Sequence, residues 1–500
     1  MKIAFVYIGS ENLGIEYLSA ILKEHGHEVR LFYDPSLFDD KYIFSIPSLS
    51  MIFNIREIII KQLIDYKPDL VCFSVFTEAF LWALEMSYSI KKNLDVKILF
   101  GGVHPTMVPE RVIKEKVVDM LIVGEGFEAL PELVNALNNN KDISKIKNLW
   151  LKTNNKVIEN PIRPVFPDLN KLPFPDKAIF AKYFSINGHY LIMTSLGCPY
   201  RCSYCSNDFF ISMYKKKGPF FRRRSPENVI KELMFAHKKY NLKAIDFQDD
   251  IFTINKSWLK DFLKLYTKQL NLPYRILSHT KFVDEEIIKL LKDTRCYRVQ
   301  FGVQSLNEKV RKTILNRIEK NQDIKKAFLL CEKYKLQYAV DHMYGIPTEG
   351  KEHQMEAARF YSQFKPARFG SFWLVYYPKT KITEIALKLK VLKLRDVEKF
   401  EKGFIKHYHE YGSVRDIDKQ KLFDNFSVFF LLIPLLPMRL NMKLADSKLL
   451  FHLHNIPFPF KIILDFIGGI KARDIDTINY ARYYMKYMIK ILLLKIRSII

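Results

Sequence analysis

The sequence predicts an α/β protein with an N-terminal doubly wound parallel sheet, a second region of six βα units and a mainly helical C-terminal region. Short apolar runs alternate with helical patterns in two stretches, which is typical of parallel sheets covered on both faces. Five prolines between residues 154 and 176 separate the stretches, because proline at this density cannot continue a helix or a central strand. The 500 residues are enough for about three domains. We place the boundaries at 1–145, 146–185 for the linker, 186–382 and 383–500.

The N-terminal region contains candidate strands at residues 3–8, 28–32, 70–74, 98–100 and 120–123, with helical patterns at 15–25, 79–92 and 129–137. Ligands of open parallel sheets bind beyond the carboxyl ends of the strands. Small and polar residues occupy those ends, namely Ser74, Thr77, Gly101, Gly102, His104, Gly124, Glu125 and Gly126. The first turn, from Gly9 to Gly14, lacks the G-x-G-x-x-G spacing of a nicotinamide site.

The second region contains candidate strands at 190–194, 245–248, 275–278, 298–301, 337–343 and 372–376. Helical patterns lie between them, for example at 226–239, 284–292 and 322–334. Six such units can form a full or partial barrel, whose chemistry lies at the C-terminal ends of the strands.

The charge balance excludes little. Lys+Arg 79 against Asp+Glu 54 gives a net charge of +25, which attracts polyanions or anionic lipid. A zinc-dependent nucleic-acid binder is therefore an alternative of another class, but no basic region is interleaved with stacking aromatics, so we expect no nucleic-acid partner. The N-terminus lacks a signal-peptide pattern, and the longest apolar run, 426–436, is shorter than the ~20 residues that span a bilayer. We expect a cytoplasmic protein.

Three of the six cysteines, Cys198, Cys202 and Cys205, lie within eight positions directly after a predicted strand. A loop this short can wrap three thiolates round one ion or cluster. Structural zinc takes four protein ligands, so a zinc site would need His189 or Asp208 as well. An iron–sulfur cube held by three thiolates instead has one iron without a protein ligand. The other cysteines, Cys72, Cys296 and Cys331, are expected to be small buried residues.

The loop resembles the C-x3-C-x-aromatic-C motif of radical S-adenosylmethionine (radical SAM) enzymes, with Tyr204 as the aromatic residue. The resemblance implies a [4Fe-4S] cluster on Cys198, Cys202 and Cys205, whose open iron is chelated by the amino and carboxylate groups of S-adenosylmethionine. It also implies that the reduced cluster cleaves this cofactor to a 5′-deoxyadenosyl radical, with Tyr204 near the adenine. The second region is then a radical SAM core, a partial (β/α)6 TIM-like barrel.

Two further strand ends fit this resemblance. Asp249 and Asp250 end the second barrel strand, where a carboxylate can accept hydrogen bonds from the ammonium group of the cofactor; the sequence does not separate the two, and a helix cap or turn is the alternative. Gln304 and Ser305 resemble the end of the family's G-x-E-S motif, with glutamine in place of glutamate. This substitution leaves a ribose contact open for Gln304 and excludes a charged role, while Ser305 can instead cap the following helix.

A parallel-sheet domain ahead of such a core resembles the cobalamin-binding subfamily, in segments 14–18, 101–106 and 119–126. The resemblance implies that 1–145 is a Rossmann-like domain of the cobalamin-binding type, with cobalamin at the strand-end residues named above. A D-x-H-x-x-G motif is absent, so we expect His104 to be a loop histidine rather than an axial ligand of cobalt. The alternative is a domain that only supports the barrel.

Together the resemblances imply a class B-like methyltransferase that methylates an unactivated carbon by way of the 5′-deoxyadenosyl radical and methylcobalamin. A radical SAM cyclase, oxidase or rearrangement enzyme without methyl transfer is the alternative. No catalytic residue is assigned beyond the cluster. We expect a small-molecule, lipid or peptide substrate and an electron donor such as flavodoxin or ferredoxin. The basic runs 215–217 and 222–224 either meet an anionic partner of this kind or form a solvated surface.

The last 22 residues, 479–500, can be laid on a helix. One stripe of it carries Arg482, Lys486, Lys490 and Arg497, and the apolar residues include Tyr484, Met488, Leu492, Ile496 and Ile499. Such a helix either makes peripheral contact with an anionic membrane or packs on the barrel, and we favour the second. The apolar run 426–436 can also line a lipid-like substrate pocket.

Overall fold

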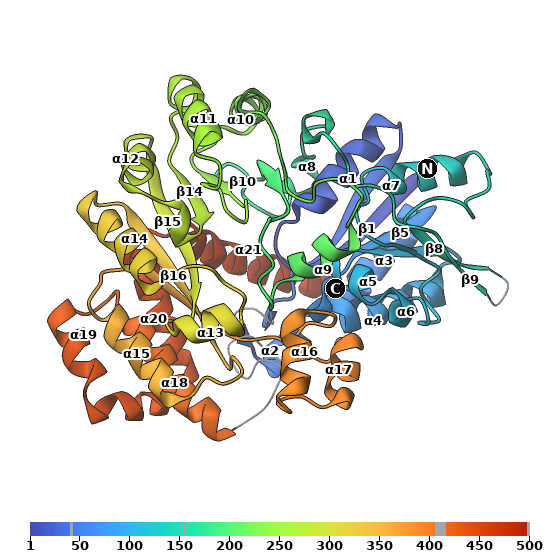
Figure 1. The fold of residues 1–500 in the computed structure, drawn as a ribbon. Coiled ribbons are helices and arrows are strands. Elements are labelled where there is room, and N and C mark those ends of the chain that lie inside the picture. Colours follow the sequence, from blue (N-terminus) through green and yellow to red (C-terminus); the bar gives the residue numbers. More distant parts are fainter. Residues whose placement is uncertain (41–43, 154–155, 406–416, 498–500) are drawn as a thin grey trace.

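The computed structural model describes residues 1–40, 44–153, 156–405 and 417–497 and shows two parallel-sheet units beside each other, followed by helices (Figure 1). The N-terminal sheet has the strand order β2-β1-β5-β6-β7-β8-β9. Its strands are β1 (Lys2–Ile8), β2 (Glu28–Asp34), β5 (Leu70–Ser74), β6 (Lys97–Gly101), β7 (Met120–Ile122), β8 (Leu149–Thr153) and β9 (Lys156–Glu159). The first five are parallel, and β8 and β9 add an antiparallel hairpin that the sequence pattern did not predict.

Strand β1 illustrates why these strands are continuous apolar runs. Phe5 packs on one face of the sheet and Val6 on the other, in two separate hydrophobic cores, because successive side chains alternate between the faces. Helices cover both faces. They are α1 (Leu13–Glu24), α2 (Pro47–Ile52), α3 (Arg56–Tyr66), η1 (Thr77–Ala79), α4 (Phe80–Asn93), α5 (Val103–Met107), α6 (Pro109–Val112) and α7 (Ala129–Asn138), and a small hairpin of β3 (Asp39–Asp40) and β4 (Phe44–Ser45) lies beside them in sequence.

The second sheet has the all-parallel order β10-β13-β14-β15-β16-β17, with β10 and β17 at its edges, so it is a partial barrel. Its strands are β10 (Tyr190–Ile192), β13 (Ile245–Phe247), β14 (Tyr274–Ser278), β15 (Cys296–Gln304), β16 (Gln337–Tyr344) and β17 (Arg368–Trp373). The last strand begins four residues earlier than predicted, because Leu374 to Tyr376 are buried in a satellite core as loop residues. Burial, rather than strand pairing, explains that apolar run.

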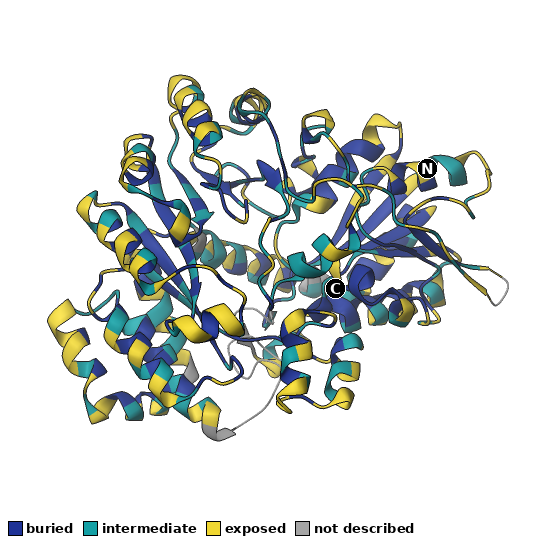
Figure 2. Cartoon of the chain, viewed as in Figure 1, coloured by how far each residue is buried: buried dark blue, intermediate teal, exposed yellow. Residues whose placement is uncertain are grey.

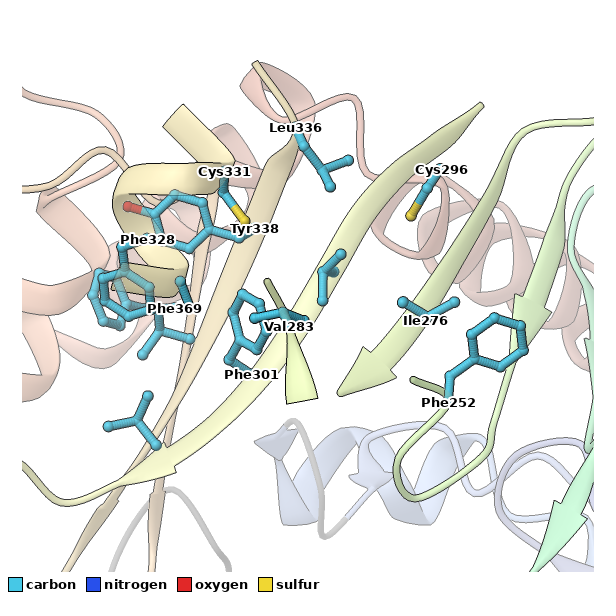
Figure 3. Close-up of a cluster of buried hydrophobic side chains, with 14 of the residues drawn as sticks. Phe252, Ile276, Val283, Cys296, Phe301, Phe328, Cys331, Leu336, Tyr338 and Phe369 are labelled. Carbon is cyan, nitrogen blue, oxygen red and sulfur yellow. The ribbon is translucent and has the colours of Figure 1, made fainter. Parts of the chain in front are cut away.

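Helices flank this sheet on its outer side (Figure 1). They are α10 (Pro226–Tyr240), α11 (Lys256–Gln269), η3 (Thr280–Phe282), α12 (Glu285–Asp293), α13 (Glu308–Thr313), α14 (Asn321–Lys333) and α15 (Lys351–Tyr361). The side chains between sheet and helices form one large core, part of which Figure 3 shows around Phe301, Phe328 and Tyr338. Each fully buried phenylalanine there contributes about 1.5–3 kcal/mol relative to an exposed one.

Helix α10 shows how local sequence sets an element's ends. The Ser225 hydroxyl caps the helix by accepting from the backbone N–H of Asn228 at 3.2 Å, and Pro226 occupies the first turn, where its missing N–H costs nothing. Asn241 ends the helix in the left-handed conformation, with φ +53°. The connecting segments hold β11 (Ser195–Leu196), β12 (Arg222–Arg223), α8 (Ala178–Ala181), α9 (Ser206–Met213) and η2 (Leu169–Lys171).

The C-terminal region is helical, with α16 (Lys381–Lys388), α17 (Leu394–Glu401), α18 (Ile417–Leu432), α19 (Met438–Ala445), η4 (Lys448–Asn455), α20 (Phe458–Lys471) and α21 (Ile475–Arg497). Helix α18 buries Phe426, Phe429 and Phe430 in the core of the second sheet, so this part of the apolar run 426–436 is core rather than pocket lining. Among the described residues, the buried ones concentrate in the sheets and the exposed ones on the outer helices (Figure 2). Together these features confirm the predicted fold class.

Helix α21 does not pack only on the barrel. Tyr484, Tyr487 and Ile491 are buried in the core of the N-terminal sheet, and the Tyr483 hydroxyl lies 2.6 Å from that of Tyr33 on β2. The C-terminal helix therefore joins the two units. Ile499 and the side chains of Ile496 and Arg497 lie outside the described residues. No helix in the described part of the chain is long and apolar enough to cross a membrane.

Candidate functional site

The three clustered cysteines follow strands β10 and β11, at the carboxyl end of the second sheet. Gly197 opens their loop with φ +79°, and a Cβ atom there would lie 2.6 Å from the Phe220 carbonyl oxygen, so only glycine fits. The backbone N–H of Cys205 donates to the Cys202 carbonyl at 3.1 Å and closes the loop. Cys198 is buried, and all three thiols are free of disulfides.

The three thiols lie close enough to influence one another electrostatically. Burial is the main cause that raises the pKa of Cys198 and of Cys205 to about 12, and a negative charge on Cys202 contributes to both rises. Within the described residues, no three His, Cys, Asp or Glu side chains are placed to hold a single metal ion. One tetrahedral zinc would need its sulfurs about 3.8 Å apart, given Zn–S bonds of about 2.3 Å. A cube separates its cysteine sulfurs more widely, because each binds a different corner.

The two side chains that could supply a fourth ligand to zinc, His189 and Asp208, have other partners. The His189 Nε2 atom lies 3.3 Å from a carboxylate oxygen of Asp246. Asp208 pairs with Arg201 at 2.6 Å. Both side chains are thus engaged elsewhere, and the free thiols fit a three-thiolate cluster better than a closed zinc site.

Arg317 is a buried cation beside this loop that no motif in the sequence indicates. Its Nη1 atom donates to the Tyr204 hydroxyl at 2.8 Å, and the guanidinium also hydrogen-bonds the Cys202 thiol. Its Nε atom donates to Glu319 at 2.5 Å, and His279 lies 3.0 Å from the other carboxylate oxygen. Burial opposes ionisation of Glu319, but His279 and Arg317 together lower its pKa to about 2. The loop is therefore held by a charged network.

The two candidate aspartates face different partners. Asp249 is fully buried and accepts from the Thr194 backbone N–H at 3.0 Å, from the Thr194 hydroxyl at 2.6 Å and from the Ser195 hydroxyl. Its carboxylate is thus committed to fastening the strand that precedes the cysteines. Asp250 is exposed, accepts from the Asn207 amide at 3.0 Å, and its charge raises the pKa of the Cys198 and Cys205 thiols. Asp250 is thus the aspartate that faces the cysteines.

Gln304 and Ser305 end strand β15 in an unusual conformation. Gln304 has φ +68°, and its side-chain amide folds back over Gly302. The Ser305 hydroxyl is fully buried; it donates to Glu349 and accepts from the Asn307 backbone N–H at 3.1 Å. Ser305 is therefore committed to protein partners, and Gln304 is the more accessible of the pair.

The Glu349 carboxyl makes folding depend on pH. Burial raises its pKa to about 8, although hydrogen bonds from Ser305 and Gln354 oppose the rise. Because this value exceeds the ordinary 4.5, its contribution to stability is complete below about pH 4.5 and is lost as the pH rises through about 8. We expect Glu349→Gln to lose less free energy of unfolding than the wild type between about pH 6 and pH 9. Urea unfolding at both pH values measures this, and parallel losses in both proteins would contradict it.

At the carboxyl end of the first sheet, the candidate residues divide into three groups. Ser74, Gly101 and Gly102 are partly or fully accessible. Gly102 has φ +99°, and a Cβ atom there would lie 2.8 Å from the backbone of Val75, so the close approach requires glycine. The requirement for glycine at this position therefore comes from packing against the neighbouring strand end.

Thr77 and His104 form the second group, and both are buried. The His104 Nδ1 atom lies 3.2 Å from the Thr77 hydroxyl, and the ring packs on Phe80 with 4.5 Å between centroids. Burial lowers the pKa of His104 to about 3, so the imidazole is neutral. The contacts of His104 with Thr77 and Phe80 are those of a histidine that stabilises its loop.

Gly124, Glu125 and Gly126 form the third group: Gly124 and Glu125 contact the second unit, whereas Gly126 lies beside Leu18 and Ile122 within the first. The Glu125 backbone N–H donates to the Tyr214 hydroxyl at 2.8 Å, and its carboxylate accepts from Arg222 at 2.5 Å. Gly124 lies directly against the Tyr214 hydroxyl with φ +88°. Tyr214 follows α9, the helix that begins directly after Cys205. The carboxyl ends of the two sheets thus meet at one interface.

The run Arg222–Arg224 is neither solvated nor open to a partner. Arg222 pairs with Glu125, Arg223 lies over the Trp258 ring at 4.3 Å, and Arg224 pairs with Glu232 at 2.5 Å. These guanidinium groups are nearly buried. Both sequence-based interpretations of this run are wrong, because each arginine is used to join elements of the fold.

Each of the two sheets lies in a region that matches a known protein family. Residues 192–361 match the radical SAM superfamily, and residues 6–134 match the B12 binding domain. This chain is a radical SAM protein with a B12-binding domain. The radical SAM match begins at the end of β10 and contains all three clustered cysteines. A radical SAM domain binds a [4Fe-4S] cluster and S-adenosylmethionine, and a B12-binding domain binds cobalamin.

One curated relative and two solved structures show what this chain is similar to. An uncharacterized methyltransferase of Pyrococcus horikoshii is 29% identical over 388 residues, which cover 76% of this radical SAM protein and 79% of the relative. The structure of OxsB, a cobalamin-dependent S-adenosylmethionine radical enzyme with aqua-cobalamin and S-adenosylmethionine bound, has a TM-score of 0.64 at 16% identity and covers 100% of this chain and 80% of its own. The structure of the methyltransferase TsrM from Kitasatospora setae, with cobalamin and a [4Fe-4S] cluster bound, has a TM-score of 0.62 at 18% identity. The match covers 77% of this chain and 78% of TsrM.

Proposed function

We propose that this radical SAM enzyme methylates an unactivated carbon of its substrate. The observation that carries the proposal is the interface between the two sheets, where Glu125 of the B12-binding domain is bound by Tyr214 and Arg222 of the cluster domain. This contact sets the cluster loop beside the open strand-end backbone of the first sheet. When bound, the cluster and S-adenosylmethionine supply a 5′-deoxyadenosyl radical, and cobalamin supplies the methyl group.

The chain's own residues bind and position these groups. Cys198, Cys202 and Cys205 are proposed as the cluster ligands. Asp250 is proposed to accept hydrogen bonds from the ammonium group of S-adenosylmethionine. Its carboxylate faces the thiols and, unlike that of Asp249, does not hold the strand before the cysteines in place. Asp249 would act only by fastening the loop. Tyr204, with its hydroxyl fixed by Arg317, is proposed to line the adenine side.

In the B12-binding domain, the proposed direct contacts are fewer than the residues that the sequence singles out. Ser74, Gly101 and Gly102 are proposed as the cobalamin-facing residues, since their backbone is accessible. Thr77 and His104 would shape the loop beneath them. Gly124 and Glu125 would act through the domain interface instead.

The partners follow from the same chemistry. A small molecule, a lipid or a peptide can be the substrate, and an acidic electron donor such as flavodoxin or ferredoxin is proposed to dock near Lys215 and Lys216, which are exposed after α9. Free thiols in the cluster loop suit a reducing compartment, so we place the enzyme in the cytoplasm.

The test uses anaerobically reconstituted enzyme with S-adenosylmethionine, a chemical reductant and a fractionated extract as the source of substrate. Methyl transfer predicts that 5′-deoxyadenosine and S-adenosylhomocysteine form together, and that one component of the extract gains the mass of a methyl group. A methyl-deuterated cofactor must carry its label into that product. Substrate-dependent 5′-deoxyadenosine without S-adenosylhomocysteine or labelled product would contradict the proposal and favour a cyclase, oxidase or rearrangement enzyme.

A further inference from the structure

The outward side of α20 is apolar. Its exposed side chains are Phe460, Ile463, Phe466, Ile467 and Ile470, which are 41–57% accessible. Their spacing of three and four residues places them on one stripe of the helix. Two charged residues of α20, Lys461 and Asp465, lie on its other side: Lys461 pairs with Asp424 at 3.7 Å and Asp465 with Arg368 at 2.8 Å. The polarity is thus the reverse of that expected for a helix that faces water.

Helix α21 carries a second exposed stripe. While its inner side is buried on the N-terminal sheet, its outer side exposes Ile478, Met485, Ile489, Leu492 and Leu493, which are 38–64% accessible. At 100° per residue these five fall within about a third of the helix circumference. A helix that packs only on its own protein needs one apolar side, and α21 has two.

Basic residues accompany the stripe on α21. Arg482, Lys486 and Lys490 are exposed and lie within or beside the apolar arc at helical spacing. Of two neighbouring acids, Asp474 is buried and pairs with Arg298 at 2.7 Å, and the half-exposed Asp465 pairs with Arg368. The exposed side of this helix therefore combines apolar side chains with positive charge.

Neighbouring apolar side chains that are exposed together on a folded protein mark a binding surface, and the charge beside them selects the partner. A neutral protein surface would leave three cations without complementary charge. The surface of an anionic bilayer supplies both requirements, because lipid phosphates face the cations while apolar side chains enter the boundary between headgroups and acyl chains.

We propose that the exposed stripes of α20 and α21 bind the surface of an anionic membrane. The aromatic and aliphatic side chains of both helices enter the interface, and Arg482, Lys486 and Lys490 contact the lipid phosphates. Neither helix contributes a residue to the candidate site, so the proposal does not depend on methyl transfer. The membrane contact that the sequence offers for the C-terminal helix is thus extended to α20, whose exposed stripe becomes visible only in the structure.

Co-sedimentation of the complete, cofactor-loaded enzyme with lipid vesicles tests the proposal. We expect binding to vesicles of phosphatidylglycerol and phosphatidylcholine in equal amounts, and much weaker binding to phosphatidylcholine alone. The pair Ile463→Glu and Ile467→Glu on α20 should lower the partition coefficient more than about tenfold, and so should the pair Ile489→Glu and Leu492→Glu on α21. Leu329→Glu on α14, a similarly exposed position at 49%, is the matched control and should bind as wild type does.

Charge removal gives an independent variant that leaves the apolar stripes intact. Arg482→Gln, Lys486→Gln and Lys490→Gln together should weaken binding to anionic vesicles by about fivefold for each cation, and added salt should weaken wild-type binding in the same way. Lys289→Gln, Lys325→Gln and Lys326→Gln on α12 and α14 remove the same charge elsewhere and should have little effect. Circular dichroism confirms that each variant is folded.

Three results would overturn the proposal. The wild type could remain in the supernatant with anionic vesicles, or the glutamate and glutamine variants could bind as well as the wild type. The third is a soluble dimer, detected by light scattering, that the glutamate variants convert to monomer. In that case a second copy of the chain, rather than lipid, covers the two helices.

Discussion

Replacing Cys202 with alanine should reduce S-adenosylmethionine cleavage to background. Cys202 is the middle thiol of the loop and receives the Arg317 hydrogen bond, so its loss removes one of three anchors of the cluster. Anaerobic reconstitution of the variant should yield far fewer than four irons per chain. Iron analysis and chromatography of 5′-deoxyadenosine measure the two effects.

Cys331→Ala is the matched control for this experiment. Cys331 is fully buried on α14 within the core of the second sheet, away from the cysteine loop in the fold. We expect a modest loss of stability with unchanged iron content and cofactor cleavage. If Cys202→Ala retained full iron and still formed 5′-deoxyadenosine, the assignment of the cluster to this loop would be wrong.

Replacing Arg317 with alanine should destabilise the fold and weaken S-adenosylmethionine binding together. The change leaves Glu319 buried without its principal cation, which typically costs about 3–5 kcal/mol in the free energy of unfolding. It also frees the Tyr204 hydroxyl and removes the positive charge beside Cys202. Urea unfolding and equilibrium binding of S-adenosylmethionine to the reconstituted enzyme measure the two losses.

Two further variants separate these effects. Arg298→Ala removes a comparably buried arginine, paired with Asp474 at the opposite end of β15, and should lose stability but retain cofactor affinity. Arg317→Lys keeps the positive charge but lacks the planar guanidinium group. It should therefore bind S-adenosylmethionine more tightly than Arg317→Ala and less tightly than the wild type. Equal cofactor affinity in the wild type and Arg317→Ala would show that this residue has only a structural role.

The fold could be predicted from the sequence wherever burial and secondary structure coincide. Strand β5 has the predicted bounds 70–74, because a strand buried on both faces is apolar without interruption. Strand β17 was displaced because the apolar run around Leu374 is buried as a loop. The hairpin β8–β9 was missed because prolines follow it closely, and the domain boundaries near it remain predictions.

The site shows a different limit. Local spacing identifies the three cysteines, since their chemistry depends on one short loop. The spacing does not separate Asp249 from Asp250, because the side chains of adjacent strand residues point in opposite directions. Only tertiary contacts decide which carboxylate is bound within the fold and which one faces the thiols. Arg317 lies more than a hundred residues from the thiol that it contacts, and no local pattern distinguishes it from a surface arginine. Long-range charge pairing was thus beyond the reach of one sequence.

Electron paramagnetic resonance of the anaerobically reconstituted, reduced enzyme tests the central claim most directly. A cube held by Cys198, Cys202 and Cys205 has one iron free of protein, so the reduced protein should give a [4Fe-4S] signal that changes when S-adenosylmethionine is added. The same samples should contain about four irons per chain. Protein that contains zinc without iron, or a cluster signal that S-adenosylmethionine leaves unchanged, would contradict the account.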